Sequence, residues 1–193
     1  MARLRVFNED DALDKAIEIF WNKGYNGTSA QDLVTYLGLS RSSLYDTFGD
    51  KRSLFLRALQ HYQQQSFDEI TSLLVKSEDI KETIKQIFER VIVESLQDKI
   101  TKGCFMVNTT VELGIHDNDI ADIVEKNRQS MEDIFLFTVQ KGQDLGQISK
   151  SNDARALARF IFNNYSGIRV LARSGGTPKE VFEDIVKVIL SVF

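Results

Sequence analysis

Apolar residues recur every three or four positions along almost the whole chain, which is the spacing of one face of an α-helix. Proline occurs once, and no long run alternates apolar and polar residues as a half-buried strand does. The pattern therefore predicts an all-α chain. Nine helices are expected, over residues 9–23, 28–37, 41–48, 50–74, 80–96, 104–114, 118–141, 154–173 and 178–193.

Residue types that begin and end helices mark the boundaries near the N-terminus. Thr28, with Gln31 three residues later, predicts a capping box at the start of the second helix. Gly38 is its expected end, because glycine accepts the left-handed backbone of many helix termini. Ser40 and Asp50 are expected to cap the third and fourth helices. Residues 28–51 thus contain two short helices joined by a tight turn.

The third helix has an apolar side and a polar side. Leu44 and Phe48 lie four residues apart and should face inward. The side chains left to point elsewhere are Arg41, Ser42, Ser43, Tyr45 and Thr47. Two helices with a glycine turn, the second of which presents small polar groups and an arginine, are typical of a DNA-reading helix-turn-helix.

This segment resembles the N-terminal domain of the tetracycline-repressor (TetR) family of bacterial transcriptional regulators. The matching residues are Phe20, Gly24-Tyr25, Thr28, Gly38-Leu39-Ser40, Leu44-Tyr45, Phe48 and Lys51. Val34 departs from the family, which usually has a small alanine there. Two later segments, GCFMVNTTVELG and GIRVLARSGG, extend the resemblance over nearly the whole chain. It implies a helix-turn-helix domain over residues 1–49 and a ligand-binding and dimerisation domain over residues 50–193.

The residues expected to contact DNA are Thr28, Arg41, Ser42, Ser43, Tyr45 and Lys51. Lys51 opposes the dipole of its own helix, and a bound phosphate would reverse this effect, although a solvated surface lysine is the alternative. Arg41 can pair with a guanine edge or contact phosphate only. Tyr45 is either a phosphate contact or a core aromatic residue.

Three other charged residues near this site are harder to assign. Asp46 would repel phosphates unless it pairs with Arg41 or Arg52 or accepts a hydrogen bond from cytosine. Arg3 and Arg5 form either an arm that contacts DNA or a disordered tail.

Three asparagines interrupt the apolar stripes of three later helices, and together they suggest a partly polar cavity. A single such residue is more often a core amide with its hydrogen bonds satisfied. The expected pocket residues are Phe88, Cys104, Asn108, Asn127, Met131, Phe135, Asn164 and Tyr165. Cys104 is the only cysteine; it is either a small buried apolar residue or a thiol-reactive sensor.

The last helix is apolar nearly all round, which predicts a second burial surface and hence a twofold partner. Val181, Ile185 and Ile189 are the expected interface residues. Thr177, Pro178 and Glu180 predict the start of this helix, as N-cap, first-turn proline and capping-box glutamate.

Charge and composition leave the function open. The net charge is −4, and residues 1–60 carry equal numbers of basic and acidic side chains, so the later part carries all of the excess. No signal-peptide core and no membrane-spanning apolar run is visible, so a cytoplasmic protein is expected.

The expected function is a homodimeric repressor that is released from a palindromic DNA operator by a small-molecule ligand. No catalytic residues, metal ligands or cofactor motif are recognised, and His61 and His116 are isolated. The alternative is a helical ligand-binding or interaction protein with a degenerate helix-turn-helix.

Overall fold

The computed structural model describes residues 7–97 and 102–193, and these residues form nine α-helices without strands. The N-terminal helices are α1 (Glu9–Gly27), α2 (Ala30–Leu37), α3 (Arg41–Phe48) and α4 (Lys51–Lys76). They are followed by α5 (Ile80–Gln97), α6 (Phe105–Leu113), α7 (Asn118–Asp144), α8 (Ala154–Arg173) and α9 (Lys179–Ser191). The predicted all-α class and the order of the helices are confirmed.

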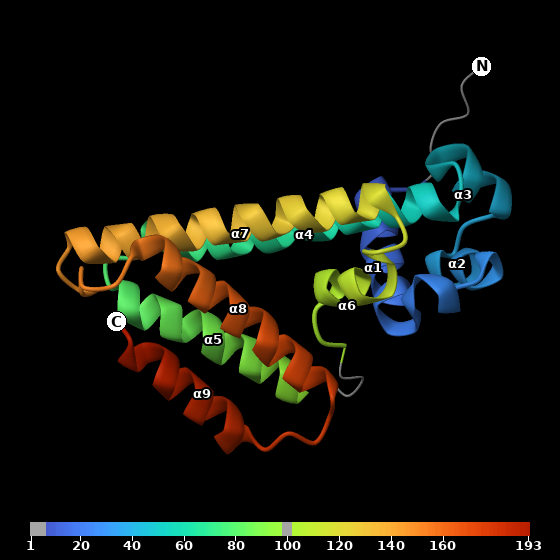
Figure 1. Cartoon of the computed structure of the whole chain (residues 1–193). Helices are drawn as coiled ribbons and strands as arrows, with labels where there is room; N and C mark the ends of the chain where they lie inside the picture. Colours follow the sequence, from blue (N-terminus) through green and yellow to red (C-terminus); the bar gives the residue numbers. More distant parts are fainter. Residues whose placement is uncertain (1–6, 98–101) are drawn as a thin grey trace.

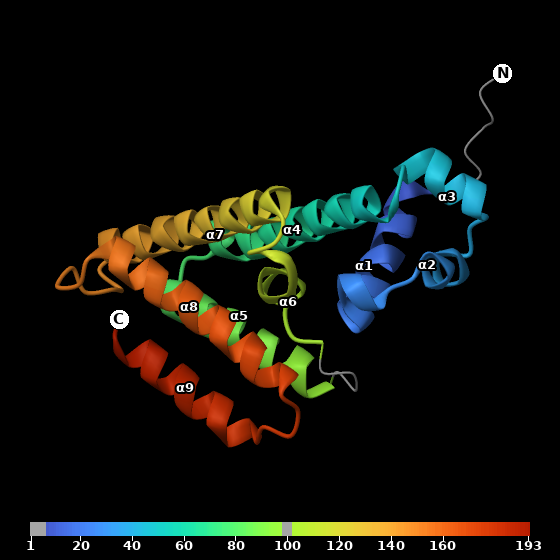
Figure 2. The ribbon, with the colours of Figure 1, turned by 45° about the vertical axis from the view of Figure 1, so that its right-hand side comes forward.

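The two longest helices, α4 and α7, run side by side and form the spine of the molecule (Figure 1). The compact head of α1, α2 and α3 lies at one end of this spine, and α5, α8 and α9 pack below its other end. Figure 2 shows α6 lying between the head and this second group of helices.

Two apolar clusters correspond to these two parts, and α4 contributes to both. Leu54 and Phe55, in its first half, are buried with the helices of the head. Ile70 and Leu74, in its last third, are buried with α5, α7, α8 and α9. The head cluster also includes Phe105 of α6, so the head core extends beyond the first three helices.

The start of α2 differs from the sequence prediction. Its N-cap is Ser29, whose hydroxyl accepts the Asp32 N–H, while the Asp32 side chain accepts the Ser29 N–H at 2.9 Å. The capping box predicted for Thr28 and Gln31 was therefore wrong by one residue. The Thr28 hydroxyl instead donates to the Gly24 carbonyl at 2.6 Å. This bond closes the end of α1, where Thr28 is the C-cap.

Gly24 was predicted to end the first helix, and its backbone does leave the helical conformation. It has φ 74° and ψ 169°, a region essentially restricted to glycine, although helical turns resume to Gly27. Gly38 ends α2 in the left-handed conformation with φ 69°, as predicted. Ser40 and Asp50 cap α3 and α4 through bonds to the Ser43 and Ser53 N–H groups, which confirms both predicted caps.

The start of α9 also departs from its prediction. Pro178 is the N-cap and makes no side-chain capping bond, so the predicted box of Thr177 and Glu180 does not form. The Thr177 hydroxyl lies 3.3 Å from the Leu171 carbonyl and donates to it. Thr177 therefore helps to end α8 and does not begin α9. No helix in the described part of the chain is long and apolar enough to cross a bilayer.

Candidate DNA-binding and ligand sites

Four of the predicted DNA contacts, which we call the reading face, lie on α3: Arg41, Ser42, Ser43 and Tyr45. Arg41 and Ser42 are exposed, whereas Ser43 is half-buried and Tyr45 is half-buried against the apolar cluster of the head. Leu44 and Phe48 hold the helix to the head, being 1% and 3% exposed. Arg41 is exposed, and its guanidinium lies 5.8 Å from the centre of the Tyr45 ring. An arginine and a phenol thus share one side of the helix.

The two serines of the reading face surround the N-cap of α3. The Ser40 hydroxyl accepts the Ser43 N–H at 3.1 Å and donates to the Ser43 hydroxyl at 2.8 Å. The Ser42 and Ser40 hydroxyl oxygens lie 3.1 Å apart. The beginning of the helix therefore carries a group of hydroxyls beside its unpaired N–H groups, a setting that suits phosphate or base edges.

Thr28, the fifth predicted DNA contact, is placed differently. Its side chain is 1% exposed, and its hydroxyl is engaged with Gly24. The structure therefore gives Thr28 a role in closing α1 and does not bring its hydroxyl to the surface. Arg3 and Arg5 lie outside the described residues.

Lys51 begins α4 and is half-buried against the head. Its ammonium nitrogen lies 4.3 Å from the centre of the Tyr25 ring, within cation–π distance. Burial lowers the pKa of Lys51, and the charge of Glu112 partly opposes this. The aromatic contact holds the ammonium of this first residue of α4 against the end of α1.

Asp46 pairs with neither of the arginines considered from the sequence, within the residues that the structure describes. Arg52 instead bonds to Asp117 at 2.9 Å and to Asp119 at 2.6 Å. Hydrogen bonds from Arg52 lower the pKa of Asp117, which also caps α7. The bonds from Arg52 to these two aspartates link the start of α4 to the start of α7.

A second link between the head and the body was missed at the sequence level. The Glu112 carboxylate on α6 accepts the Tyr25 N–H at 3.1 Å and the Asn26 N–H at 2.8 Å. The Trp21 indole N–H donates to the Lys102 carbonyl at 3.0 Å, just before α6. No sequence spacing could reveal contacts between residues more than eighty positions apart. Together they hold α6 against the end of α1.

A cavity of about 230 Å³ opens between α4, α6, α7 and α8. Four of the predicted pocket residues line it: Cys104, Asn127, Met131 and Tyr165. The cavity is also lined by polar residues that were not predicted from the sequence: Tyr62, Ser66, Thr110, Arg128 and Ser166. Polar residues are common on helix surfaces, so their sequence positions alone did not single them out.

The other four predicted pocket residues lie elsewhere. Phe88 and Phe135 are fully buried behind the cavity, where their rings lie 6.4 and 6.2 Å from that of Tyr165. The Asn108 amide donates to the Lys102 carbonyl at 2.9 Å, and that of Asn164 to the Phe160 carbonyl at 2.8 Å. Neither asparagine lines the cavity, because each amide is turned back onto nearby backbone.

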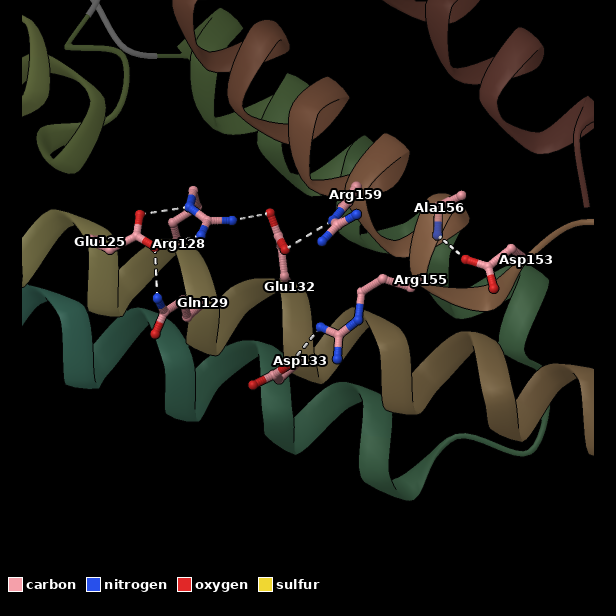
Figure 3. A network of polar contacts seen from close by, with 9 residues as sticks. All are labelled: Glu125, Arg128, Gln129, Glu132, Asp133, Asp153, Arg155, Ala156 and Arg159. Carbon is pink, nitrogen blue, oxygen red and sulfur yellow. Dashed lines mark hydrogen bonds and ion pairs between the residues drawn. The ribbon is translucent and has the colours of Figure 1, made fainter.

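The charged residue of the cavity wall, Arg128, is already paired. Figure 3 shows its guanidinium between Glu125 and Glu132 on the same helix. Glu132, which is 8% exposed, is also approached by Arg159 of α8 at 3.5 Å. The arginine charge is therefore balanced within the protein.

The Cys104 thiol lies at the start of α6, half-buried, with its sulfur 3.8 Å from the Tyr62 hydroxyl. Burial raises the pKa of Tyr62 well above its ordinary value, so the phenol stays protonated. The cavity thus offers uncharged polar groups within a mainly apolar wall.

The predicted dimer residues divide between two sides of α9. Ile189 is 1% exposed within one protomer, because it packs in this chain's own core, so its side chain is not at the surface of the protomer. Ile185 is half-buried and Val181 is 41% exposed. The uncovered apolar positions of α8 and α9 are Phe160, Val170, Val181 and Val188.

Family models match both parts of this architecture. Residues 12–58 match that of the bacterial regulatory proteins of the tetR family, and residues 81–183 match the tetracyclin repressor-like C-terminal domain. The HTH-type transcriptional regulator YezE of Bacillus subtilis (strain 168) is 33% identical over 193 residues, covering 100% of this chain and 99% of that protein.

Two further relatives point the same way. The transcriptional repressor ComR of Escherichia coli (strain K12) is 32% identical over 94% of this chain and 87% of its own. A solved structure of the TetR family regulator CifR, a cysteine mutant in complex with 26-bp operator DNA, has a TM-score of 0.86 at 26% identity, over 99% of this chain and 100% of that chain. The chain belongs to the TetR family of helix-turn-helix transcriptional regulators.

Proposed function

We propose that this protein is a homodimeric repressor that binds a palindromic operator through α3 and leaves it when a small molecule occupies the cavity. The observation that carries the proposal is the presence of exposed Arg41 and Ser42 at the start of α3, with Lys51 at the start of the next helix. CifR, whose fold matches over nearly the whole chain, is seen with operator DNA. Residues 1–49 are the proposed DNA-binding domain and residues 50–193 the ligand-binding and dimerisation domain, in a protein of the cytoplasm.

The uncovered apolar side of α8 and α9 supports the homodimer. Val181 and Val188 lie seven residues apart, and hence on one side of α9. Phe160, which is 37% exposed, adds apolar area from α8. A twofold axis at this surface would bring two such pairs of helices together, and two heads could then read half-sites about 34–36 Å apart.

The position of α6 supports release by ligand. Thr110 lies on the cavity side of α6, and Glu112, two residues later, holds the end of α1. A ligand that favours one position of α6 would change the position of the head. Such a coupling must be reciprocal, so operator and ligand weaken one another's binding equally.

Selection from a random duplex library with the purified protein tests the proposed function. A palindromic motif should be enriched, with two half-sites about one helical turn apart. If a folded, dimeric protein enriches no motif, it is not an operator-binding repressor, and a helical ligand-binding or interaction protein is the better description. Activity as an enzyme has no comparable support, since the relatives reported above are transcriptional regulators.

A further inference from the structure

The chemistry of the cavity wall restricts what it can hold. Its wall is mainly apolar, with Met131 and Phe162 among the side chains that contribute to it. Burying an unpaired charge in such surroundings is strongly unfavourable. No carboxylate lines the cavity within the described residues, so a cationic ligand would find no counter-ion there.

An anion is disfavoured for a different reason. Arg128, the cationic residue of the wall, is bound on both sides by Glu125 and Glu132 (Figure 3). An anionic ligand would have to displace one of these carboxylates or lie beside it. The nearby Arg169 does not line the cavity; its guanidinium donates to the Tyr165 hydroxyl at 2.7 Å and lies 4.0 Å from Glu94. Neither an anion nor a cation therefore finds a free partner of opposite charge in the cavity wall, and an uncharged ligand is favoured.

The uncharged polar groups of the wall still have hydrogen-bonding capacity. Among described residues, the structure gives no side-chain hydrogen bond to Ser66, Asn127 or Ser166. The Tyr62 hydroxyl has only the long contact to the Cys104 sulfur. These groups can donate to a carbonyl or accept from a hydroxyl.

The volume limits the size of the part of a ligand that lies inside the cavity. An apolar cavity of about 150 Å³ is large enough for benzene. The present cavity, about 230 Å³, therefore has room for one ring and a short substituent.

We propose that the cavity binds a small uncharged molecule, of about the size of a substituted benzene ring, that carries one carbonyl or hydroxyl group. This inference rests on the proposed function, in which occupancy of the same cavity releases DNA. The Asn127 amide and the Tyr62 hydroxyl are the groups placed to bind the polar end. Met131 and Phe162 contact the ring.

Three probes of almost equal shape separate the charge classes: acetophenone is neutral, benzoate is anionic and benzamidinium is cationic. Calorimetry with the full-length dimer should show binding of acetophenone, with the two ions at least about tenfold weaker because their charges would be unpaired. Equal or tighter binding of either ion would overturn the proposed class. Failure of acetophenone to bind at millimolar concentrations would overturn it as well.

The chain provides its own reporter of the binding site. Trp21 is the only tryptophan, and its ring lies 5.2 Å from that of Tyr62 in an edge-on arrangement. The single indole N–H resonance should therefore shift when acetophenone is added. If calorimetric heat appears while this resonance stays unchanged, the probe binds elsewhere and the assignment to this cavity is wrong.

Two variants test the wall directly. Ser166→Phe should fill the cavity and abolish acetophenone binding, whereas Ser72→Phe, the same change at an exposed site on α4, should leave it intact. Asn127→Leu keeps the volume and removes the amide, so affinity should fall roughly three- to tenfold even if the phenylalanine variant folds poorly. Unchanged affinity in Asn127→Leu and in a folded Ser166→Phe would overturn the proposal.

The same samples, assayed with the selected operator, separate this inference from the proposed function. If acetophenone occupies the cavity without weakening operator binding, the ligand class stands and the release mechanism fails. If the operator binds tightly but none of the probes binds, the repressor remains and the ligand class is wrong.

Discussion

Arg41 and Lys51 are both cations beside the proposed DNA surface, but their surroundings differ. Arg41 is exposed at the beginning of α3, where a long side chain reaches furthest. Lys51 is half-buried and lies on the Tyr25 ring. An exposed guanidinium suits the edge of a base, whereas an ammonium at a helix N-terminus suits a phosphate.

Alanine variants at these two positions should therefore lose DNA binding in different ways. Arg41→Ala should cost roughly 1–3 kcal/mol per half-site and relax base preference at one symmetric pair of positions. Lys51→Ala should weaken all sequences alike and lower the salt slope by roughly one unit per head. Operators with single substitutions, titrated at two salt concentrations, distinguish the two results.

Lys126→Ala, at an exposed position on α7, is the control and should change neither property. If Arg41→Ala loses affinity with no loss of base preference, Arg41 is a phosphate contact. Recognition of the base sequence would then depend on Ser42, Ser43 and the shape of the DNA.

At the residue scale, the sequence predicted the structure best where a residue type has a single local role, such as ending or capping a helix. The left-handed conformation of Gly38 and the caps formed by Ser40 and Asp50 followed from such local chemistry. Thr28 shows where this reasoning fails. Two adjacent hydroxyl residues could each cap α2, and the choice of Ser29 depends on the bond from Thr28 to Gly24, which no spacing rule predicts.

At the scale of elements, α6 is placed to transmit a signal, since it lies between the cavity and the head. Its contact with the head needs both Glu112 and Gly24. A Cβ atom at Gly24 would lie 2.9 Å from a Glu112 carboxylate oxygen, so the Glu112 side chain would have to shift, and the φ of 74° at Gly24 itself favours glycine. The positions of the helices were predictable from their apolar spacing, but this contact depends on how the helices pack.

Removal of the carboxylate should release the end of α1. In Glu112→Ala the N–H groups of Tyr25 and Asn26 lose their acceptor, so their hydrogen exchange should be faster. Two-dimensional NMR exchange measurements on the free protein would test this without any ligand.

Glu125→Ala, which removes a carboxylate from α7 that bonds to Arg128, is the matched control. It should leave exchange at Tyr25 and Asn26 unchanged. Equal exchange in wild type and Glu112→Ala would show that α6 does not hold the head in this way.

At the scale of the whole molecule, the structure of one protomer distinguishes buried core residues from exposed apolar residues more clearly than the sequence pattern does. The almost wholly apolar sequence of α9 predicted more burial than one stripe requires, but periodicity could not say which side faces inward. Phe182, Val186 and Ile189 pack in the protomer, whereas Val181 and Val188 point away from it. The cavity likewise forms only where four helices meet. Of the eight pocket residues expected from the sequence, four line this cavity and four lie elsewhere.

The homodimer should therefore depend on Val188 and not on Ile189. Val188→Asp places a carboxylate at a position that is 60% exposed in one protomer, so the fold should be kept while the dimer surface acquires an unpaired charge costing several kcal/mol. Sedimentation at micromolar concentration should show folded monomers. Val75→Asp, at a site 51% exposed near the end of α4, should stay dimeric. A fully dimeric Val188→Asp protein would place the twofold axis on another face, and the two heads would then have a different separation on DNA.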